Sequence, residues 1–77
     1  LTLKDVIFSC IMIENESEGK IKMSFRSQGA FSVNDFAKTY FNGGGHNNAA
    51  GGMSLENMQD TVERFKKAVK EVSLKLK

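Results

Sequence analysis

The first part of the chain alternates apolar and polar side chains with the period of two that is typical of β-strands. Residues 6–14 read VIFSCIMIE and are apolar on both alternating faces, which predicts a strand in the middle of a covered sheet. A short acidic turn follows. Residues 20–27 then place Ile21, Met23 and Phe25 on one face and polar side chains on the other, as in a half-buried strand. We expect these two strands to pair as an antiparallel hairpin.

The next segment shows the apolar period of an α-helix. Ser32 is placed to cap its first turn, and Asp35 follows three residues later, as in a capping arrangement. Phe31 is positioned to pack on Phe36 across this start, as a hydrophobic staple does. The Asn-Gly pair at 42–43 ends the helix, since glycine readily adopts the left-handed conformation that closes helices. Its apolar stripe is formed by Val33, Phe36, Ala37, Tyr40 and Phe41.

A second helix occupies the C-terminal part of the chain. Residues 53–56 read MSLE and are interpreted as a short strand before it. Asn57 is placed to cap this helix, with Asp60 in its first turn. The apolar stripe consists of Met58, Val62, Phe65, Val69, Val72 and Leu76. The predicted order is therefore β-β-α-β-α, an α/β (α+β) domain in which a small mixed sheet of about three strands packs with two helices.

Length and composition fit a single small domain that spans residues 1–77. The chain is 40% hydrophobic with a formal charge of +2, which by itself does not argue for a nucleic-acid partner. No apolar run approaches a membrane span of about 20 residues. One cysteine and one histidine exclude an internal disulfide and a zinc site made of protein ligands alone. With a single cysteine the chain is expected to be cytoplasmic, and because it begins with Leu1 rather than Met, we expect a fragment of a larger protein.

The segment 43–52, GGGHNNAAGG, holds five of the seven glycines. Glycines let backbone N–H groups approach a ligand closely and form a concave anion site. His46 adds a side-chain donor, and Asn47 and Asn48 add amides. On spacing alone, a tight helix-to-strand turn explains the segment as well as an anion-binding loop does. The segment matches neither the phosphate loop that ends in Lys-Ser/Thr nor the dinucleotide fingerprint.

Arg26 is the second candidate for anion binding. It ends a strand whose polar face also presents Ser24, and Ser27 follows it. Arginine holds phosphate through a planar fork of donors, although a lone arginine on a sheet is more often a solvated charge. Arg26, Ser27 and His46, with the glycine segment, could converge on one phosphate. No pair of carboxylates and no Ser/His/Asp order indicates a catalytic group in this chain.

The segment 23–29, MSFRSQG, followed by GGGHNNAAGG, resembles the subtype-one accessory domain of DHH phosphoesterases over essentially the whole chain. The strand motif is matched by Ser24, Arg26 and Ser27. The glycine-histidine motif is matched by Gly43, Gly44, Gly45, His46, Ala49, Ala50 and Gly51. The resemblance implies no catalytic or metal-binding residue in this module. It implies substrate binding by Arg26, Ser27, Gly43, Gly44, Gly45, His46 and Asn47.

Members of this family join the module to an N-terminal catalytic domain named after its Asp-His-His motif. The arrangement is most similar to the nanoRNase or oligoribonuclease type, which is related to RecJ and often labelled exopolyphosphatase-related. The resemblance implies a bacterial, cytoplasmic hydrolase whose catalytic domain holds Mn²⁺ and cleaves short RNA, single-stranded DNA or nucleotide phosphates. This module would close over that domain and hold substrate phosphate, and on its own it would be inactive.

The alternative is a non-catalytic nucleic-acid-binding module. The C-terminal region of alanyl-tRNA synthetase carries a related glycine motif, and residues 64–77 of this chain hold six basic residues against one acidic residue. Cations at the end of a helix also suit its dipole without any ligand. The synthetase motif has Arg-Pro where this chain has His46 and Asn47, which favours the phosphoesterase branch.

Overall fold

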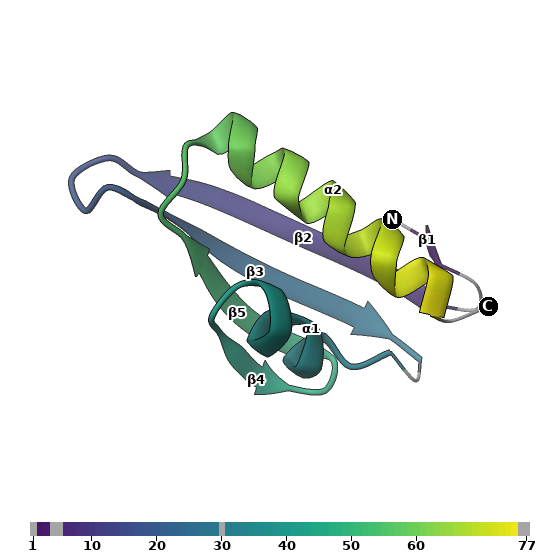
Figure 1. The fold of residues 1–77 in the computed structure, drawn as a ribbon. Helices are drawn as coiled ribbons and strands as arrows, with labels where there is room; N and C mark the ends of the chain where they lie inside the picture. The colour runs from purple at the N-terminus through teal and green to yellow at the C-terminus, as the bar shows by residue number, and fades with distance from the viewer. Residues whose placement is uncertain (1, 4–5, 30, 76–77) are drawn as a thin grey trace.

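The computed structural model describes residues 2–3, 6–29 and 31–75. Its elements are β1 (Thr2–Leu3), β2 (Val6–Asn15), β3 (Lys20–Gln28), α1 (Val33–Tyr40), β4 (Gly44–His46), β5 (Ala49–Ser54) and α2 (Met58–Lys75). The strands form one sheet in the order β1-β2-β3-β5-β4, and the two helices pack against it (Figure 1). The predicted α+β class is therefore confirmed.

The sheet differs from the predicted one in the number and direction of its strands. It has five described strands, because β1 and β4 are too short to show a periodic pattern in the sequence. β4 and β5 form a hairpin, and β5 also pairs antiparallel with β3. All pairings between the described strands are antiparallel, so the expectation of a mixed sheet was wrong.

β2 and β3 form the long antiparallel hairpin that the alternating pattern predicted. Asn15 holds its turn: the side-chain oxygen accepts hydrogen bonds from the Ser17 hydroxyl at 2.8 Å and from the Glu18 N–H at 3.2 Å. Gly19 closes the turn with a φ of 65°, a conformation that glycine adopts without a steric penalty. The register of this hairpin decides which side chains of the two strands share a face.

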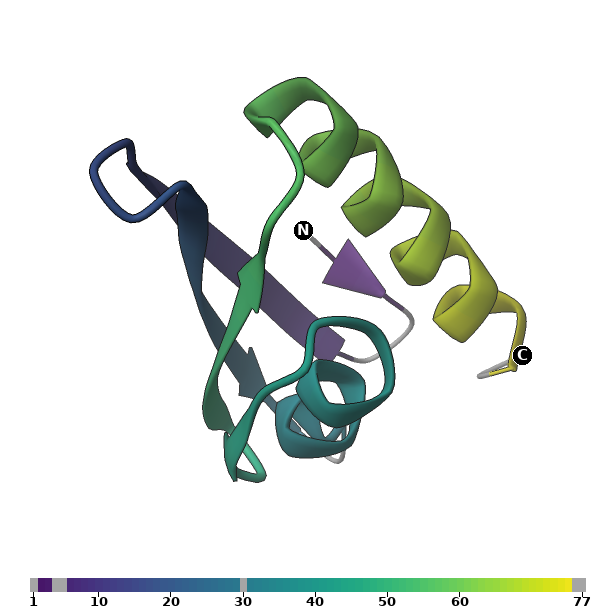
Figure 2. The ribbon, with the colours of Figure 1, turned by 60° about the vertical axis from the view of Figure 1, so that its left-hand side comes forward.

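One face of the sheet is open. Both helices lie on the same side of it, as Figure 2 shows. On the other side Ile7, Ile11 and Ile13 of β2 are 55%, 62% and 61% exposed. The prediction that residues 6–14 form a covered central strand was therefore wrong. Only the side of β2 that carries Phe8 is buried, and the outer neighbour of β2 is the two-residue β1.

α1 begins where the sequence predicted. The Ser32 hydroxyl accepts a hydrogen bond from the Asp35 N–H at 3.2 Å, which satisfies a donor that the helix itself leaves free. The rings of Phe31 and Phe36 pack across this start with centroids 6.1 Å apart. At the other end the asparagine of the 42–43 pair, rather than the glycine, is left-handed with a φ of 57°. Asparagine is one of the few residues that tolerate this conformation.

α2 begins after Asn57, whose side-chain oxygen accepts a hydrogen bond from a first-turn N–H at 2.7 Å, as predicted. Of the predicted stripe, Met58, Phe65, Val69 and Val72 pack against the core. The buried face also contains Thr61 and Ala68, which the apolar pattern did not reveal. The Thr61 hydroxyl lies 2.7 Å from the hydroxyl of Ser54 in β5, so a buried polar pair joins the helix to the sheet. The predicted stripe residue Leu76 lies outside the described residues.

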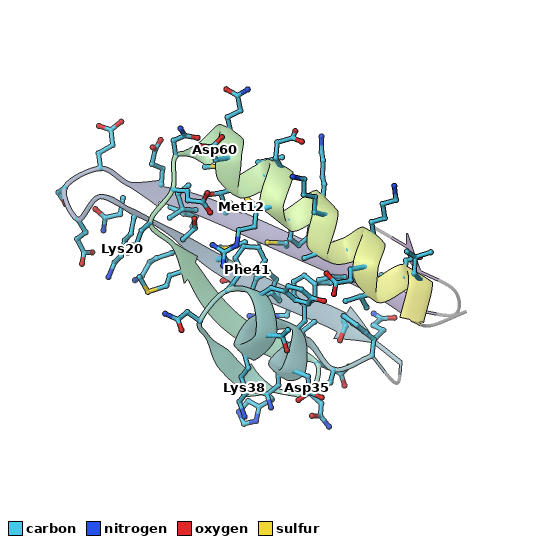
Figure 3. The ribbon with its side chains drawn as sticks, viewed as in Figure 1. Met12, Lys20, Asp35, Lys38, Phe41 and Asp60 are labelled. Carbon is cyan, nitrogen blue, oxygen red and sulfur yellow. The ribbon has the colours of Figure 1, made fainter. Side chains whose placement is uncertain are left out.

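Phenylalanine rings fill the space between the sheet and the helices. Phe8 and Phe25 from the sheet and Phe41 after α1 are 0% exposed. The Phe36 ring lies 5.0 Å from that of Phe8 and 5.4 Å from that of Phe25, and Phe65 of α2 lies 5.8 Å from Phe8. Figure 3 shows Phe41 between the two helices. This core holds both helices on one face of the sheet, and side chains on the opposite face are exposed.

Candidate phosphate-binding site

Residues 43–52 form a β-hairpin rather than the loop that their glycine content predicted. β4 and β5 pair antiparallel, and the Asn-Asn pair at 47–48 makes the turn between them. The strand predicted at 53–56 is instead Ala49–Ser54. Glycines have no side chain that could alternate between faces, so the sequence pattern did not reveal the first part of this strand.

Three glycines of the hairpin are required by close packing. A Cβ atom at Gly43 would lie 1.9 Å from a backbone oxygen of β5, and one at Gly45 would lie 2.7 Å from another. A Cβ atom at Gly52 would lie 2.9 Å from the Cβ of Phe41. No larger residue fits at these distances unless the backbone moves. Close packing within the domain, and no ligand, therefore accounts for Gly43, Gly45 and Gly52.

The backbone N–H groups at the start of the hairpin have partners within the domain. The Gly43 N–H donates to the carbonyl of Ala37 at 3.1 Å, and the Gly45 N–H donates to the side-chain oxygen of Asn34 at 3.0 Å. A donor that is already bonded gains little by turning to a ligand, because it loses its first bond. Side chains are therefore better donors to an anion at this hairpin than these backbone N–H groups are.

Arg26 and His46 share the open face of the sheet. Arg26 on β3 and His46 on β4 both lie opposite Ala49, and directly opposite residues point to the same face. Their backbones are two strand spacings apart, about 10 Å. Both residues are exposed, and the Arg26 guanidinium donates to the carbonyl of Phe25 at 3.1 Å. A phosphate above Ala49 would lie within reach of both side chains.

Gly51 lies on the same face, opposite Ser24 of β3. A Cβ atom at Gly51 would meet only the carbonyl oxygen of Met23, at 3.5 Å, which is an ordinary contact. Packing inside this domain therefore does not require glycine here. The small Ala49 lies between Arg26 and His46, and Gly51 adds no side chain beside it on the same face, so that a ligand could approach the sheet closely.

The strand positions on this face carry no acidic side chain in the described part of the chain. β3 presents Lys22, Ser24 and Arg26, and the positions opposite them on β2 and β5 hold neither Asp nor Glu. The positive charges of this face are therefore not neutralised by neighbours on the strands. Such a local field attracts anions.

Ser27 does not join Arg26 and His46. It lies on the helix side of β3 and is 8% exposed. Its hydroxyl donates to the carbonyl of Phe31 at 2.9 Å and accepts from the side-chain amide of Asn48 at 2.9 Å. These bonds hold the β4–β5 turn against β3, which is a structural role. Sequence reasoning missed this role of Asn48, because its partner lies 21 positions away along the chain.

Asn47 lies at the tip of the hairpin, beside the start of α1. Its carbonyl accepts a hydrogen bond from the Val33 N–H at 2.7 Å, and its side-chain oxygen lies 3.5 Å from the Ser32 hydroxyl. The residue is exposed and follows His46 directly. Of the predicted site residues, the structure therefore brings Arg26 and His46 to one face, places Asn47 at its edge, and uses Gly43 and Gly45 for packing.

Cys10 adds no reactive group to this face. It lies opposite Phe25, on the helix side of the sheet. Burial raises the pKa of its thiol to about 11, so the thiol is neutral near pH 7 and behaves as a packing group.

The described residues contain no group of three or more His, Cys, Asp or Glu that could hold a metal ion. In the same part of the chain, no helix has the length and apolar character needed to span a bilayer.

The basic side chains of α2 lie on the other side of the molecule. Lys66, Lys67 and Lys70 are exposed on a helix that packs against the covered face of the sheet (Figure 2). The sheet separates them from Arg26 and His46, so the two basic regions do not form one continuous surface. A single nucleic-acid strand lying on one face would contact only one of them.

Known proteins share this fold and these motifs. The DHHA1 domain family matches residues 4–74. The chain belongs to this family. A crystal structure of an exopolyphosphatase-related protein from Bacteroides fragilis is similar to the DHHA1 domain described here, with a TM-score of 0.81 and 40% sequence identity over 90% of this chain. This domain covers only 20% of that protein's chain. No curated protein gives a significant match.

The resemblance to a DHH-associated accessory domain is thereby confirmed. The strand that carries Arg26 and the hairpin that carries His46 both lie within the matched residues of the DHHA1 domain. The narrower assignment to the nanoRNase type stays a prediction.

Proposed function

We propose that this DHHA1 domain is the substrate-binding module of a DHH-family phosphoesterase, and that it holds a substrate phosphate between Arg26 and His46. One observation carries this role: both residues lie opposite Ala49 on the open face of the sheet. An arginine fork and an imidazole donor suit the oxygens of a phosphate. Gly51 supports the same role, because it adds no side chain on the same face next to Ala49, which lies between the two residues.

The parent protein in this proposal is a bacterial, cytoplasmic hydrolase with an N-terminal DHH domain. Its substrates would be short RNA, single-stranded DNA or nucleotide phosphates. Hydrolysis of such phosphoesters is commonly driven by metal ions that activate water and stabilise the leaving oxygen. The expected Mn²⁺ would be held by the catalytic domain, since the described residues here offer no metal-binding cluster. This chain would contribute phosphate binding and positioning, and would be inactive alone.

An NMR titration of this chain with 3′-phosphoadenosine 5′-phosphate tests the phosphate site. We expect shifts concentrated at the amides of Arg26, His46 and Gly51. Arg26→Ala and His46→Ala should each weaken binding by about tenfold or more, because a hydrogen bond to a charged group contributes about 1.5–3 kcal/mol.

Lys70→Ala is the matched control, since it removes an exposed cation from α2. It should leave the affinity nearly unchanged. Affinity that is the same in the wild type, Arg26→Ala and His46→Ala would contradict the proposed site. An equal loss in all three variants would indicate nonspecific attraction to net charge, and it would contradict the site as well.

A further inference from the structure

His46 is carried by a short edge strand of the sheet. β4 has three residues, two of them glycines, and it pairs with β5 alone, at the end of the described strand order. Glycine loses more conformational freedom on folding than any other residue. Short edge segments with few backbone bonds open locally at a small cost in free energy. An imidazole on such a strand keeps a fixed distance from Arg26 only if other bonds hold the strand in place.

The start of α1 bonds the residue on either side of His46. The side-chain oxygen of Asn34 accepts a hydrogen bond from the Gly45 N–H at 3.0 Å. On the other side, the Val33 N–H donates to the carbonyl of Asn47 at 2.7 Å. Val33 is the first residue of α1, so its N–H has no partner within the helix and is free for this bond. The segment that carries the imidazole is therefore held at both ends by α1.

Asn48 ties the turn after His46 to the strand that carries Arg26. Its side-chain amide donates to the Ser27 hydroxyl at 2.9 Å and to the Gly29 carbonyl at 3.3 Å. Its own carbonyl accepts a hydrogen bond from the Ser27 N–H at 3.1 Å. Ser27 follows Arg26 directly in the chain, and Asn48 lies two residues after His46. These bonds therefore set the separation of the two residues that the phosphate site requires.

We propose that Asn34 and Asn48 are positioning residues of the phosphate site, which hold the His46 imidazole where it and Arg26 contact the same phosphate. This inference rests on the proposed function and extends it to two residues that do not need to touch the ligand. Both asparagine side chains already have partners within the domain, so each acts through the chain segment that it holds. A binding group that is in place beforehand adds affinity, because the ligand does not have to order it.

Loss of either bond should lower the fraction of molecules whose imidazole is in place, which raises the apparent dissociation constant by the same factor. Asn34→Ala and Asn48→Ala should each weaken binding of 3′-phosphoadenosine 5′-phosphate by about three- to tenfold, the factor that corresponds to one neutral hydrogen bond. The His46 amide should also become more mobile without ligand, which a lower NMR order parameter would report. An NMR titration and backbone relaxation of this chain measure the two effects.

Asn15→Ala is the matched control. It removes the same kind of bond, from a main-chain N–H to an asparagine oxygen, in the turn before β3. Arg26 lies about 20 Å further along that strand. Asn15→Ala should leave the phosphate affinity and the mobility of the His46 amide unchanged. The substituted asparagines are exposed or half-buried, so all three variants are expected to fold, which their amide spectra would verify.

A double-mutant cycle with His46→Ala separates positioning from a general loss of structure. If the asparagines act through the imidazole, Asn34→Ala and Asn48→Ala should cause no further loss of affinity in a chain that carries His46→Ala. A merely structural role would lower the affinity by the same factor with and without His46, and that result would overturn the inference. In a chain that carries Arg26→Ala, Asn34→Ala should still weaken binding, because the imidazole contact remains.

His46→Ala alone separates this inference from the proposed function. Weaker binding in His46→Ala, with wild-type affinity in Asn34→Ala and Asn48→Ala, would support the phosphate site and overturn the positioning role. Wild-type affinity in His46→Ala would contradict the phosphate site and, with it, the positioning role. A His46 amide that is equally rigid in the wild type and in Asn34→Ala would overturn the positioning role of Asn34 whatever the affinity.

Discussion

Gly43 directly precedes β4 and Gly51 lies in β5, and an added Cβ atom would meet different surroundings at the two positions. At Gly43 an added Cβ would collide with the Gly51 oxygen at 1.9 Å. At Gly51 an added Cβ would point into the open face and meet one atom at an ordinary distance. Packing inside the domain explains the glycine at position 43. It does not require the glycine at position 51.

These two glycines therefore predict opposite effects of the same substitution. Gly51→Ala should change the free energy of unfolding by no more than about 1 kcal/mol, and in the stabilising direction, since alanine is less flexible than glycine in a strand. It should weaken phosphate binding by adding a methyl group to the open face next to Ala49, which lies between Arg26 and His46. Gly43→Ala should lower stability by about 1–3 kcal/mol or more through overpacking.

Thermal unfolding and the phosphate titration would measure both effects on the same samples. Gly51→Ala that binds phosphate as tightly as the wild type would show that the ligand does not approach the floor of this face.

The elements are joined to one another by polar contacts as well as by apolar packing. Ser54 at the end of β5 and Thr61 in the first turns of α2 are 2% and 0% exposed, and their hydroxyls lie 2.7 Å apart. The Ser54 hydroxyl also accepts a hydrogen bond from the Glu56 N–H at 3.1 Å. Three neighbouring hydrogen-bonding groups thus set where α2 begins relative to the sheet. A periodic apolar pattern cannot reveal such a contact, because both residues are polar.

Thr61→Val tests this connection with almost no change in side-chain volume. We expect a loss of about 1–2 kcal/mol in the free energy of unfolding, because the Ser54 hydroxyl is left buried with one partner fewer. Urea denaturation would measure it. Thr39→Val in α1 is the control, since Thr39 is exposed, and it should change stability by less than about 0.5 kcal/mol. Equal effects of the two substitutions would show that the buried pair contributes nothing.

The whole molecule consists of one sheet with a covered face and an open face. Phe25 lies at the centre of the covered face, fully buried and in ring contact with Phe8, Phe36, Phe41 and Phe65. Because one core supports both helices, the arrangement of the open face depends on this core too. A small domain of this kind has a net stability of only about 5–10 kcal/mol.

Phe25→Ala should therefore strongly destabilise the domain. Deleting a buried phenylalanine side chain costs about 3–5 kcal/mol, which is between about a third and all of a net stability of about 5–10 kcal/mol. Circular dichroism and the dispersion of amide signals in NMR would measure the loss. Leu55→Ala is the control, because Leu55 is 73% exposed and its truncation should cost less than about 0.5 kcal/mol. A Phe25→Ala variant that loses no more stability than Leu55→Ala would mean that the aromatic cluster is not the source of the stability.

Local features were predictable from the sequence because they depend on neighbours in the chain. The Ser32 cap and the Asn57 cap involve residues three positions apart, the β2–β3 hairpin joins two strands that follow each other in the chain, and all three are confirmed. Arg26 and His46 were also recognisable as candidates, because a basic strand end and a histidine among glycines are unusual. Their motif placed the chain in its family. The sequence therefore determined which segments form the hairpin and the helix starts, which residues are candidates for the site, and the local conformation of each segment.

Tertiary structure decided which parts meet and which face is covered. The pairing of β3 with β5 and of β5 with β4 brings Arg26 and His46 to one face across 20 positions of sequence. The same pairing turns Ser27 to the helix side. Both helices pack on one side, so the isoleucines of β2 stay exposed although their pattern predicted a covered strand. These outcomes depend on contacts between residues far apart in the chain, and an apolar side chain by itself does not specify which surface will cover it.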